Sequence, residues 1–227
     1  MTAFLVIQGT YQDVRIGLFN THILLNTIVI KNSEASKQLI PTINELLSTH
    51  NLSLDTLSFI AANQGPGPFT TLRTILTTVN GINFASKTPL IGIDTLKAFA
   101  DEWHDDAFPN TVVLLDAFNN DVYYHIQSSM IDACHTGYEK IDSFLARLAQ
   151  QNTQQTIRFI GNAVHLYQNK IEAALAEYAY VPTPIPSLCS LLFMGKESLK
   201  AWHRQKVSIQ LLPLYLKKHQ AEIDLLR

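Results

Sequence analysis

The chain has 227 residues, of which 47% are hydrophobic and 16% are charged. This length predicts one large domain or two small ones, and the hydrophobic content is ample for a core. The formal net charge of −2 excludes a field that attracts nucleic acid over a distance. A charged fraction below the usual value of about 25% favours a surface that a partner partly covers. A surface rich in threonine, asparagine and glutamine would give the same composition.

The two cysteines, Cys134 and Cys189, lie far apart and outside any spacing typical of a metal site. Buried thiols in a reducing compartment are therefore expected. The first residues, MTAFLVIQGT, lack the basic start of a signal peptide. No stretch approaches about 18 apolar residues, so no membrane span is predicted and the expected location is the cytoplasm.

Strand and helix patterns alternate over the first half of the chain. Three strands joined by short turns predict an antiparallel meander, and the following helix should be capped by Ser33 and bent at Pro41. Asp94 is the expected cap of the last helix in this half. The strands are expected at 3–8, 13–19, 22–30, 57–63 and 89–93, and the helices at 33–50, 69–85 and 94–104.

The same order of elements starts again after residue 110. Strands are expected at 111–117, 121–127, 129–135 (weak) and 156–161, and helices at 140–150, from Ala163, and from Ser187 to about His203. The order β-β-β-α-β-α thus occurs twice and predicts an α/β fold with a mixed sheet in each half. This is the actin-like, sugar-kinase-like (ASKHA, ribonuclease H-like) plan. The expected halves are 1–104 and 105–227, with a C-terminal segment able to return to the first half.

In that plan ATP lies between the halves, and a carboxylate at a strand end holds Mg²⁺. Here the first strand ends in Gln8, a neutral amide, and only the second half has a carboxylate at the corresponding place, Asp116. Both residues are interpreted as remnants of a nucleotide cleft, with a simple turn role favoured for Asp116.

The turn Gly65-Pro66-Gly67-Pro68 is rich in glycine but lacks the lysine of a Walker A loop. Its prolines remove two backbone N–H donors, so a rigid turn is favoured over a phosphate cradle. The histidines show no HxxxH or HExxH spacing. No catalytic residue, metal or cofactor is therefore expected, although ATP with Mg²⁺ is not excluded, either in this chain or at the interface of a complex.

The helix that follows this turn has two contrasting faces. Leu72, Ile75, Leu76, Val79 and Ile82 form an apolar stripe that should pack on the sheet. The opposite side carries threonines and, after Arg73, no charge until Lys87. Threonine is a mediocre helix former, and interface cores are depleted in charge. The pattern favours a helix held between its sheet and another chain, with coverage by the chain's own second half as the alternative.

Five stretches together form a recognisable pattern: Gly65-Pro66-Gly67-Pro68-Phe69-Thr70-Thr71-Leu72-Arg73, Pro89-Leu90-Ile91-Gly92-Ile93-Asp94-Thr95-Leu96, Leu39-Ile40-Pro41, Leu115-Asp116-Ala117 and Pro213-Leu214-Tyr215-Leu216-Lys217. Through them the sequence resembles the TsaB (YeaZ) family. The resemblance runs in order along nearly the whole chain and is most specific over 57–96. The chain departs from the family pattern at Gln8-Gly9, where Asp-Thr is usual, near Ala35, where a histidine is usual, and at Phe118, where an arginine is usual. Each departure removes a polar group, which makes nucleotide use less expected.

The resemblance implies a non-catalytic scaffold, a paralogue of the enzyme TsaD in threonylcarbamoyladenosine (t6A) biosynthesis. Such a subunit pairs with TsaD and, with the ATPase TsaE, supports threonylcarbamoyl transfer to N6 of adenosine 37 in tRNAs that read ANN codons. It contacts tRNA only through the complex and forms a homodimer when TsaD is absent.

The resemblance also places the contact on the helices 33–48 and 69–85. The expected interface residues are Leu39, Ile43, Thr70, Thr71, Arg73, Thr74, Thr77 and Thr78. The alternative function is that of a small-molecule phosphotransferase or ATPase that uses Asp116 and the loop at Gly65.

Overall fold

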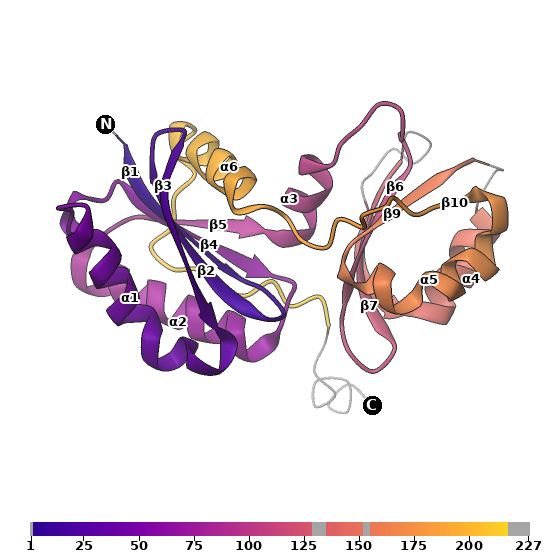
Figure 1. The fold of residues 1–227 in the computed structure, drawn as a ribbon, viewed down its shortest axis with the longest axis horizontal. Helices are drawn as coiled ribbons and strands as arrows, with labels where there is room; N and C mark the ends of the chain where they lie inside the picture. The colour runs from indigo at the N-terminus through magenta and orange to yellow at the C-terminus, as the bar shows by residue number, and fades with distance from the viewer. Residues whose placement is uncertain (1, 129–134, 152–154, 218–227) are drawn as a thin grey trace. The chain divides into compact units, whose positions relative to one another are not determined.

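The computed structural model describes residues 2–128, 135–151 and 155–217. The chain divides into two compact units, each with its own sheet (Figure 1). Unit 1 consists of Met1–Ala98 and Cys189–Leu214, and unit 2 of Phe99–Leu188 and Tyr215–Arg227. The first segment of unit 1 therefore ends before residue 104, the expected boundary. Unit 1 also includes a long C-terminal stretch that the sequence analysis assigned mainly to the second half.

Unit 1 is built on a five-stranded mixed sheet with the strand order β3-β2-β1-β4-β5. Its strands are β1 (Ala3–Gly9), β2 (Asp13–Asn20), β3 (Ile23–Lys31), β4 (Phe59–Gly65) and β5 (Leu90–Asp94). The first three form the predicted antiparallel meander, and β4 and β5 run parallel to β1. The buried central strand β1 pairs Ile7 with Ile16 on one side and with Ala62 on the other.

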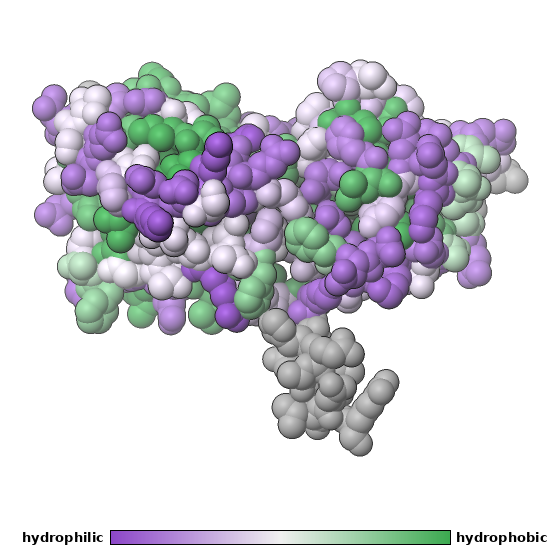
Figure 2. Space-filling view, turned by 60° about the horizontal axis from the view of Figure 1, so that its bottom comes forward, coloured by the Kyte–Doolittle hydropathy of each residue, from purple (hydrophilic) through white to green (hydrophobic). Residues whose placement is uncertain are grey.

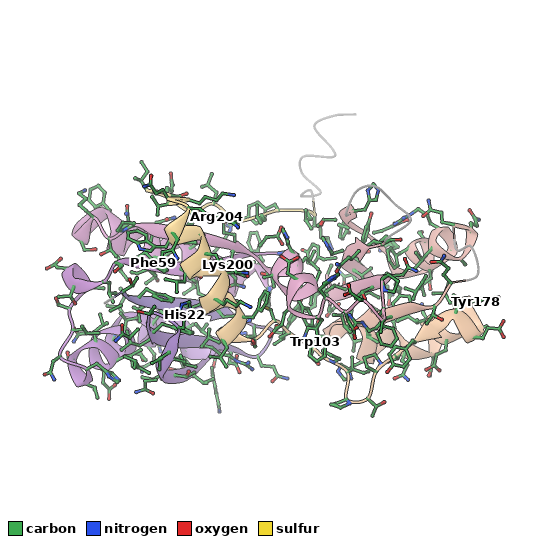
Figure 3. The ribbon with its side chains drawn as sticks, turned by 90° about the horizontal axis from the view of Figure 1, so that it is seen from above. His22, Phe59, Trp103, Tyr178, Lys200 and Arg204 are labelled. Atoms are coloured by element: carbon green, nitrogen blue, oxygen red, sulfur yellow. The ribbon has the colours of Figure 1, made fainter. Side chains whose placement is uncertain are left out.

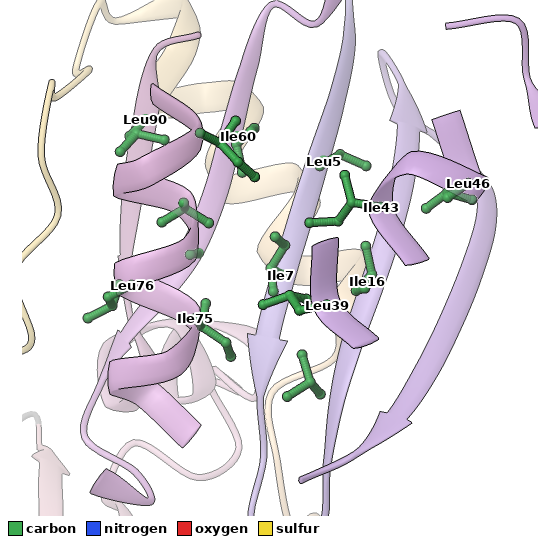
Figure 4. Packing of buried hydrophobic residues seen from close by; sticks show 14 of the residues in the cluster. Leu5, Ile7, Ile16, Leu39, Ile43, Leu46, Ile60, Ile75, Leu76 and Leu90 are labelled. Carbon is green, nitrogen blue, oxygen red and sulfur yellow. The ribbon is translucent and has the colours of Figure 1, made fainter. Parts of the chain in front are cut away.

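Two helices, α1 (Ala35–Thr49) and α2 (Phe69–Ser86), cover one face of this sheet (Figure 4). Their apolar stripes meet Leu5, Ile7 and Ile60 of the strands in one buried cluster. The prediction that Ser33 caps α1 is wrong, because the chain first makes a 3-10 turn, η1 (Asn32–Glu34), and no side chain caps the helix.

The opposite face of the sheet is aromatic. Phe4 stacks between Phe19 and Phe59, with ring centroids 5.1 and 4.4 Å away, and Phe59 stacks on Trp202 at 5.2 Å. Trp202 belongs to α6 (Leu191–His203), which lies across this face and is capped by Ser190 (Figure 3). The sequence placed this helix in the second half, but its apolar side covers the aromatic face of unit 1.

Unit 2 repeats the plan of unit 1 with the strand order β10-β9-β6-β7-β8. Its elements are β6 (Thr111–Asp116), β7 (Asp121–Gln127), β8 (His135–Lys140), α4 (Ile141–Gln151), β9 (Ile157–Ile160), α5 (Asn162–Leu175) and β10 (Ala179–Tyr180). A short helix, α3 (Thr95–Glu102), spans the division between the units, and Asp94 caps it as predicted. Most of the weak strand expected at 129–135, and Cys134, lie outside the described residues.

Both sheets therefore begin with an antiparallel meander and continue with parallel strands. This confirms the predicted actin-like, sugar-kinase-like plan. No helix in the described part of the chain combines the length and apolar character needed to cross a membrane.

Candidate docking surface

The Gly-Pro turn directs α2 away from β4. Gly65, the last residue of β4, has φ +107°, a left-handed value that favours glycine. A Cβ added there would come within 3.0 Å of Leu72 Cδ1, so the turn packs directly against the first turn of α2. Pro66 is buried, Gly67 and Pro68 are half-buried, and no side chain caps the helix. The turn thus shapes the start of the helix.

The inward side of α2 carries the apolar stripe. Leu72, Ile75, Leu76, Val79 and Ile82 are all buried, as predicted. Thr71 is buried with them, and its Cγ2 lies 2.9 Å from the position that a Cβ on Gly9 would take. Its assignment to the partner surface is therefore wrong for this structure: Thr71 faces the sheet.

The same correction applies to α1. Leu39 and Ile43 were expected at the interface, but both are buried in the core of unit 1 between α1 and the strands. The face of α1 that packs on the sheet cannot also contact a partner chain. The exposed side of α1 presents instead Ile40 and Pro41, together with polar side chains, and Ala35 is buried at the start of the helix.

The outward side of α2 is apolar in character despite its hydroxyl groups. Thr70, Arg73 and Thr77 are exposed, and Thr74 and Thr78 are half-buried. The hydroxyl of Thr74 donates to the carbonyl of Thr70 at 3.0 Å, and that of Thr78 to Thr74 at 2.8 Å. These bonds satisfy the donors of both hydroxyls within the helix. The Arg73 guanidinium lies over the Phe69 ring at 3.9 Å, which reduces its reach into solvent.

Two further residues extend this surface and were missed in the sequence. Phe84 is 79% exposed and lies seven positions after Thr77, on the same side of the helix. Gly81 lies between them, and a Cβ added there would meet nothing within 4 Å. The spacing of Thr70, Thr77 and Phe84 was the available signal. Figure 2 turns the helical side of unit 1 forward, where green and white side chains lie among the purple ones.

The end of β1, where a nucleotide site would need a carboxylate, is closed. Gln8 is 1% exposed, and its Nε2 donates to the carbonyl of Cys189 at 2.8 Å. The next residue, Gly9, exchanges two hydrogen bonds with the Asn63 amide, and an added Cβ would come 2.8 Å from Ile75 Cδ1. Side chains of unit 1 therefore fill the space around this strand end.

Asp116 lies at the end of β6, half-buried. Its carboxylate accepts a hydrogen bond from the backbone N–H of Phe118 at 2.9 Å, and its own N–H donates to Asn162 Oδ1 at 3.1 Å. Phe118, Asn119 and Asn120 then follow with φ near +60°. These contacts are those of a turn residue, the interpretation favoured from the sequence.

A charged cluster in unit 2 surrounds the buried carboxylate of Asp121. Lys140 and Lys217 donate to it at 2.8 and 2.9 Å, and Tyr138 donates a third, short hydrogen bond. Burial alone would raise the pKa of Asp121, but the bonds from Lys140, Tyr138 and Lys217 outweigh it and lower the pKa to about 2. The cluster attaches the end of the described chain to unit 2.

Acid should therefore weaken unit 2 through Asp121. Because the folded-state pKa lies below the unfolded one, the stabilisation is complete above about pH 5 and mostly lost between about pH 4 and pH 2. The loss is expected to be roughly 2 kcal/mol. Denaturant unfolding of wild type and Asp121→Asn between pH 6 and pH 2 measures it. The stability gap between the two proteins should narrow as the pH falls, and a constant gap would contradict the assignment.

An open polar pocket of about 440 Å³ lies in unit 2, lined by Glu102, Trp103, His104, Asp105, Asp106 and Arg158. In the lining of this pocket, Arg158 pairs with Asp105 at 3.6 Å and His104 contacts Asp106 at 3.4 Å. Among the described residues, no group of three or more histidine, cysteine and acidic side chains is placed to hold a metal ion.

Comparison with solved structures shows which proteins share the fold. Two solved structures from Pseudomonas aeruginosa, one titled YeaZ and one described as similar to the peptidase YEAZ, match with TM-scores of 0.69 and 0.71. They share 21% and 20% identity and cover 95% and 96% of this chain and all of theirs. The chain thus shares the fold of these proteins over 95–96% of its length.

Sequence comparison gives the family. A family model described as TsaD, tRNA N6-adenosine threonylcarbamoyltransferase, matches residues 29–225. Relatives named tRNA threonylcarbamoyladenosine biosynthesis protein TsaB, from Escherichia coli K12 and Haemophilus influenzae, are 27% and 34% identical over 92 residues. Those stretches cover 40% and 39% of this chain, and only 40% and 38% of the relatives' own length. The chain belongs to this family, among its TsaB (YeaZ) members.

Proposed function

We propose that this chain is a non-catalytic docking subunit for a TsaD-like threonylcarbamoyltransferase, in the modification of a tRNA adenosine. It binds the enzyme through the outward sides of α1 and α2. A TsaE-like ATPase joins the complex, tRNA is contacted only through the complex, and the chain pairs with itself when the enzyme is missing. The TsaB relatives carry the name of this biosynthetic route.

The observation that carries the proposal is the outward side of α2. The hydroxyls of Thr74 and Thr78 are bonded within the helix, and together with Gly81 and the Phe84 ring these small side chains form a surface with little charge. A helix that only faces water gains nothing from threonine, whose branched side chain disfavours helix formation. Close packing against another helix does use small side chains without charge.

The residues at the strand ends favour a subunit without nucleotide chemistry of its own. Gln8 is buried and bonded to a backbone carbonyl, and the Asp116 carboxylate holds a turn. Titration calorimetry with ATP and Mg²⁺ separates this from the phosphotransferase alternative, and no heat of binding at micromolar affinity is expected. Binding that disappears in Asp116→Ala would favour the alternative.

The direct test uses the chain and a TsaD-like subunit from the same source. Size exclusion with light scattering should show a one-to-one complex that replaces any homodimer. The complex should form without ATP, because the proposed contact is a packing surface. Two separate proteins at micromolar concentration would contradict the proposed function.

A charge placed on the outward side of α2 should break this complex. Thr74→Lys and Thr77→Lys bury an unpaired charge on docking, which costs roughly 3 kcal/mol or more and weakens binding by about 100-fold. Thr27→Lys on β3, an exposed threonine outside the helical face, is the matched control. Calorimetry gives the affinities, and melting temperatures within a few degrees of wild type show that the variants fold. Unchanged affinity of the α2 variants would remove this face from the interface.

A further inference from the structure

The chain returns to unit 1 after α6 as an extended strap, residues 207–214, which lies along the edge of β5 and beside α2 (Figure 1). Ser208 exchanges two backbone hydrogen bonds with Leu90 of β5, at 2.8 and 3.0 Å. Three residues later, Leu211 exchanges two hydrogen bonds with the Asn80 side chain of α2, at 2.8 and 2.9 Å. The strap is therefore tied to the docking helix itself.

The second half of the strap is held by Gln64, the residue before the Gly-Pro turn. Its side-chain amide donates to the carbonyl of Leu212 at 2.6 Å, and its backbone carbonyl accepts from the N–H of Leu214 at 2.8 Å. A Cβ on Gly92 would overlap the Gln64 side chain, so the glycine of the Pro-Leu-Ile-Gly-Ile stretch leaves room for this clamp. The parts of the sequence that flank α2 thus fix the strap in place.

The clamps hold the strap by its backbone and leave apolar side chains exposed. Leu211 is buried in the core, whereas Ile209 and Leu212 are 87% and 63% exposed. Val207 and Leu214 of the same strap are 44% and 38% exposed, so exposed apolar side chains gather on this one segment, which is typical of an interaction site. Phe84 of α2 is exposed one helical turn after Asn80, which holds Leu211.

The two docking helices alone would give a small interface. With 18 and 15 residues, α2 and α1 are about 27 and 22 Å long, and each presents a face about 10 Å wide. Together these faces have a footprint of about 500 Å², near the lower limit for a specific interface, whereas a standard-sized one buries about 800 Å² on each partner. An extended strap of this length adds a strip about 26 Å long, which closes most of the gap.

We propose that the strap is part of the docking surface and that Ile209 and Leu212 are apolar anchors for the TsaD-like subunit. This inference rests on the proposed function and adds a segment far from α1 and α2 in sequence. The occupant is a chain of the same fold, since the family model of the enzyme also matches this chain. Asn80 and Gln64 act as positioning residues that present the strap.

The test measures the affinity of the full chain for the TsaD-like subunit by calorimetry. Ile209→Glu and Leu212→Glu should each weaken binding by about tenfold or more, because a charge replaces an anchor that the complex buries. Leu192→Glu is the matched control: it is 56% exposed in unit 1, on α6 and so on the opposite face of the sheet. The control should stay within about twofold of wild type, and all three variants should melt within a few degrees of it.

A second pair of variants tests the clamps. Asn80→Ala and Gln64→Ala should weaken binding less than Ile209→Glu, by about three- to tenfold. Cleavage within residues 207–214 by a protease should become faster in both, which a residue acting only by direct contact would not cause.

The outcomes separate the two claims. If Ile209→Glu and Leu212→Glu bind like wild type while Thr77→Lys does not, the strap is not an anchor and the proposed function stands. An equal loss in Leu192→Glu would also overturn the strap proposal, because the effect would then be one of charge alone. If the wild-type chain does not bind the enzyme, both claims fail.

Discussion

Gly161→Ala is expected to unfold unit 2. Gly161 has φ +115°, in a region that is essentially restricted to glycine, and a Cβ there would overlap the backbone carbonyl of Leu114 in the central strand β6. The backbone cannot move aside easily, because the Gly161 N–H donates to Pro186 at 2.7 Å and its carbonyl accepts from Val164 at the start of α5. The expected loss exceeds about 4 kcal/mol, a large part of the stability of a small unit.

The two tryptophans make this prediction measurable, since Trp103 belongs to unit 2 and Trp202 to unit 1. In a Trp103→Phe background, the fluorescence of Trp202 should keep its native spectrum while circular dichroism shows the loss of unit 2. Gly81→Ala is the control: its Cβ would meet nothing, so a gain of up to about 1 kcal/mol is expected. A melting temperature of Gly161→Ala close to wild type would contradict the steric argument.

Gln8→Asp should be the second most damaging change, although it introduces the carboxylate that a nucleotide site would need at this strand end. Aspartate loses the hydrogen bond from Nε2 to the Cys189 carbonyl and places a carboxylate at a site that is 1% exposed. Burial beside a carbonyl oxygen disfavours the charged form, so about 3 kcal/mol of stability should be lost at neutral pH.

The pH dependence of this loss distinguishes charge from shape. Burial raises the pKa of the new carboxyl group, so the destabilisation should shrink when denaturant unfolding is repeated at pH 5. Gln8→Asn, which is shorter but neutral, should lose only about 1 kcal/mol at either pH. Equal losses for the two variants at pH 7 would show that shape, and not charge, decides. Neither variant is expected to gain ATP binding, because Ile75 and Thr71 still occupy the space beside Gly9 at the strand end.

Local patterns in the sequence predicted the elements well, because helix and strand periodicity depends on near neighbours. The buried stripe of α2 and the meander of β1 to β3 both follow directly from it. The same periodicity could not say which sheet α6 covers, since an apolar stripe fits either unit. The structure shows that the placement of α6 depends on a glycine of the first sheet. An added Cβ on Gly17 would come 2.7 Å from Leu191 Cδ2 of α6.

The docking surface was predicted on α2, and the structure removes single residues from that prediction. Thr71 and Thr74 differ by three positions and so lie near each other on the helix, yet one is buried and the other half-buried. Only the packing of Thr71 against Gly9 separates them. The strap has no periodicity, and its bond to Asn80 joins residues 131 positions apart, so no local pattern could place it.

The path of the chain through the two units has a consequence for its synthesis. Residues 99–188 of unit 2 form one continuous stretch of sequence, whereas unit 1 is incomplete until Cys189–Leu214 have been synthesised. On a nascent chain, Phe4, Phe19 and Phe59 thus stay without the cover of α6 until the ribosome has made the whole central part of unit 2. Unit 2 can therefore bury its core before unit 1 can, although most of unit 1 is encoded first. A fragment that ends before Leu191 keeps the aromatic face of the first sheet bare, so an N-terminal half produced alone is expected to aggregate.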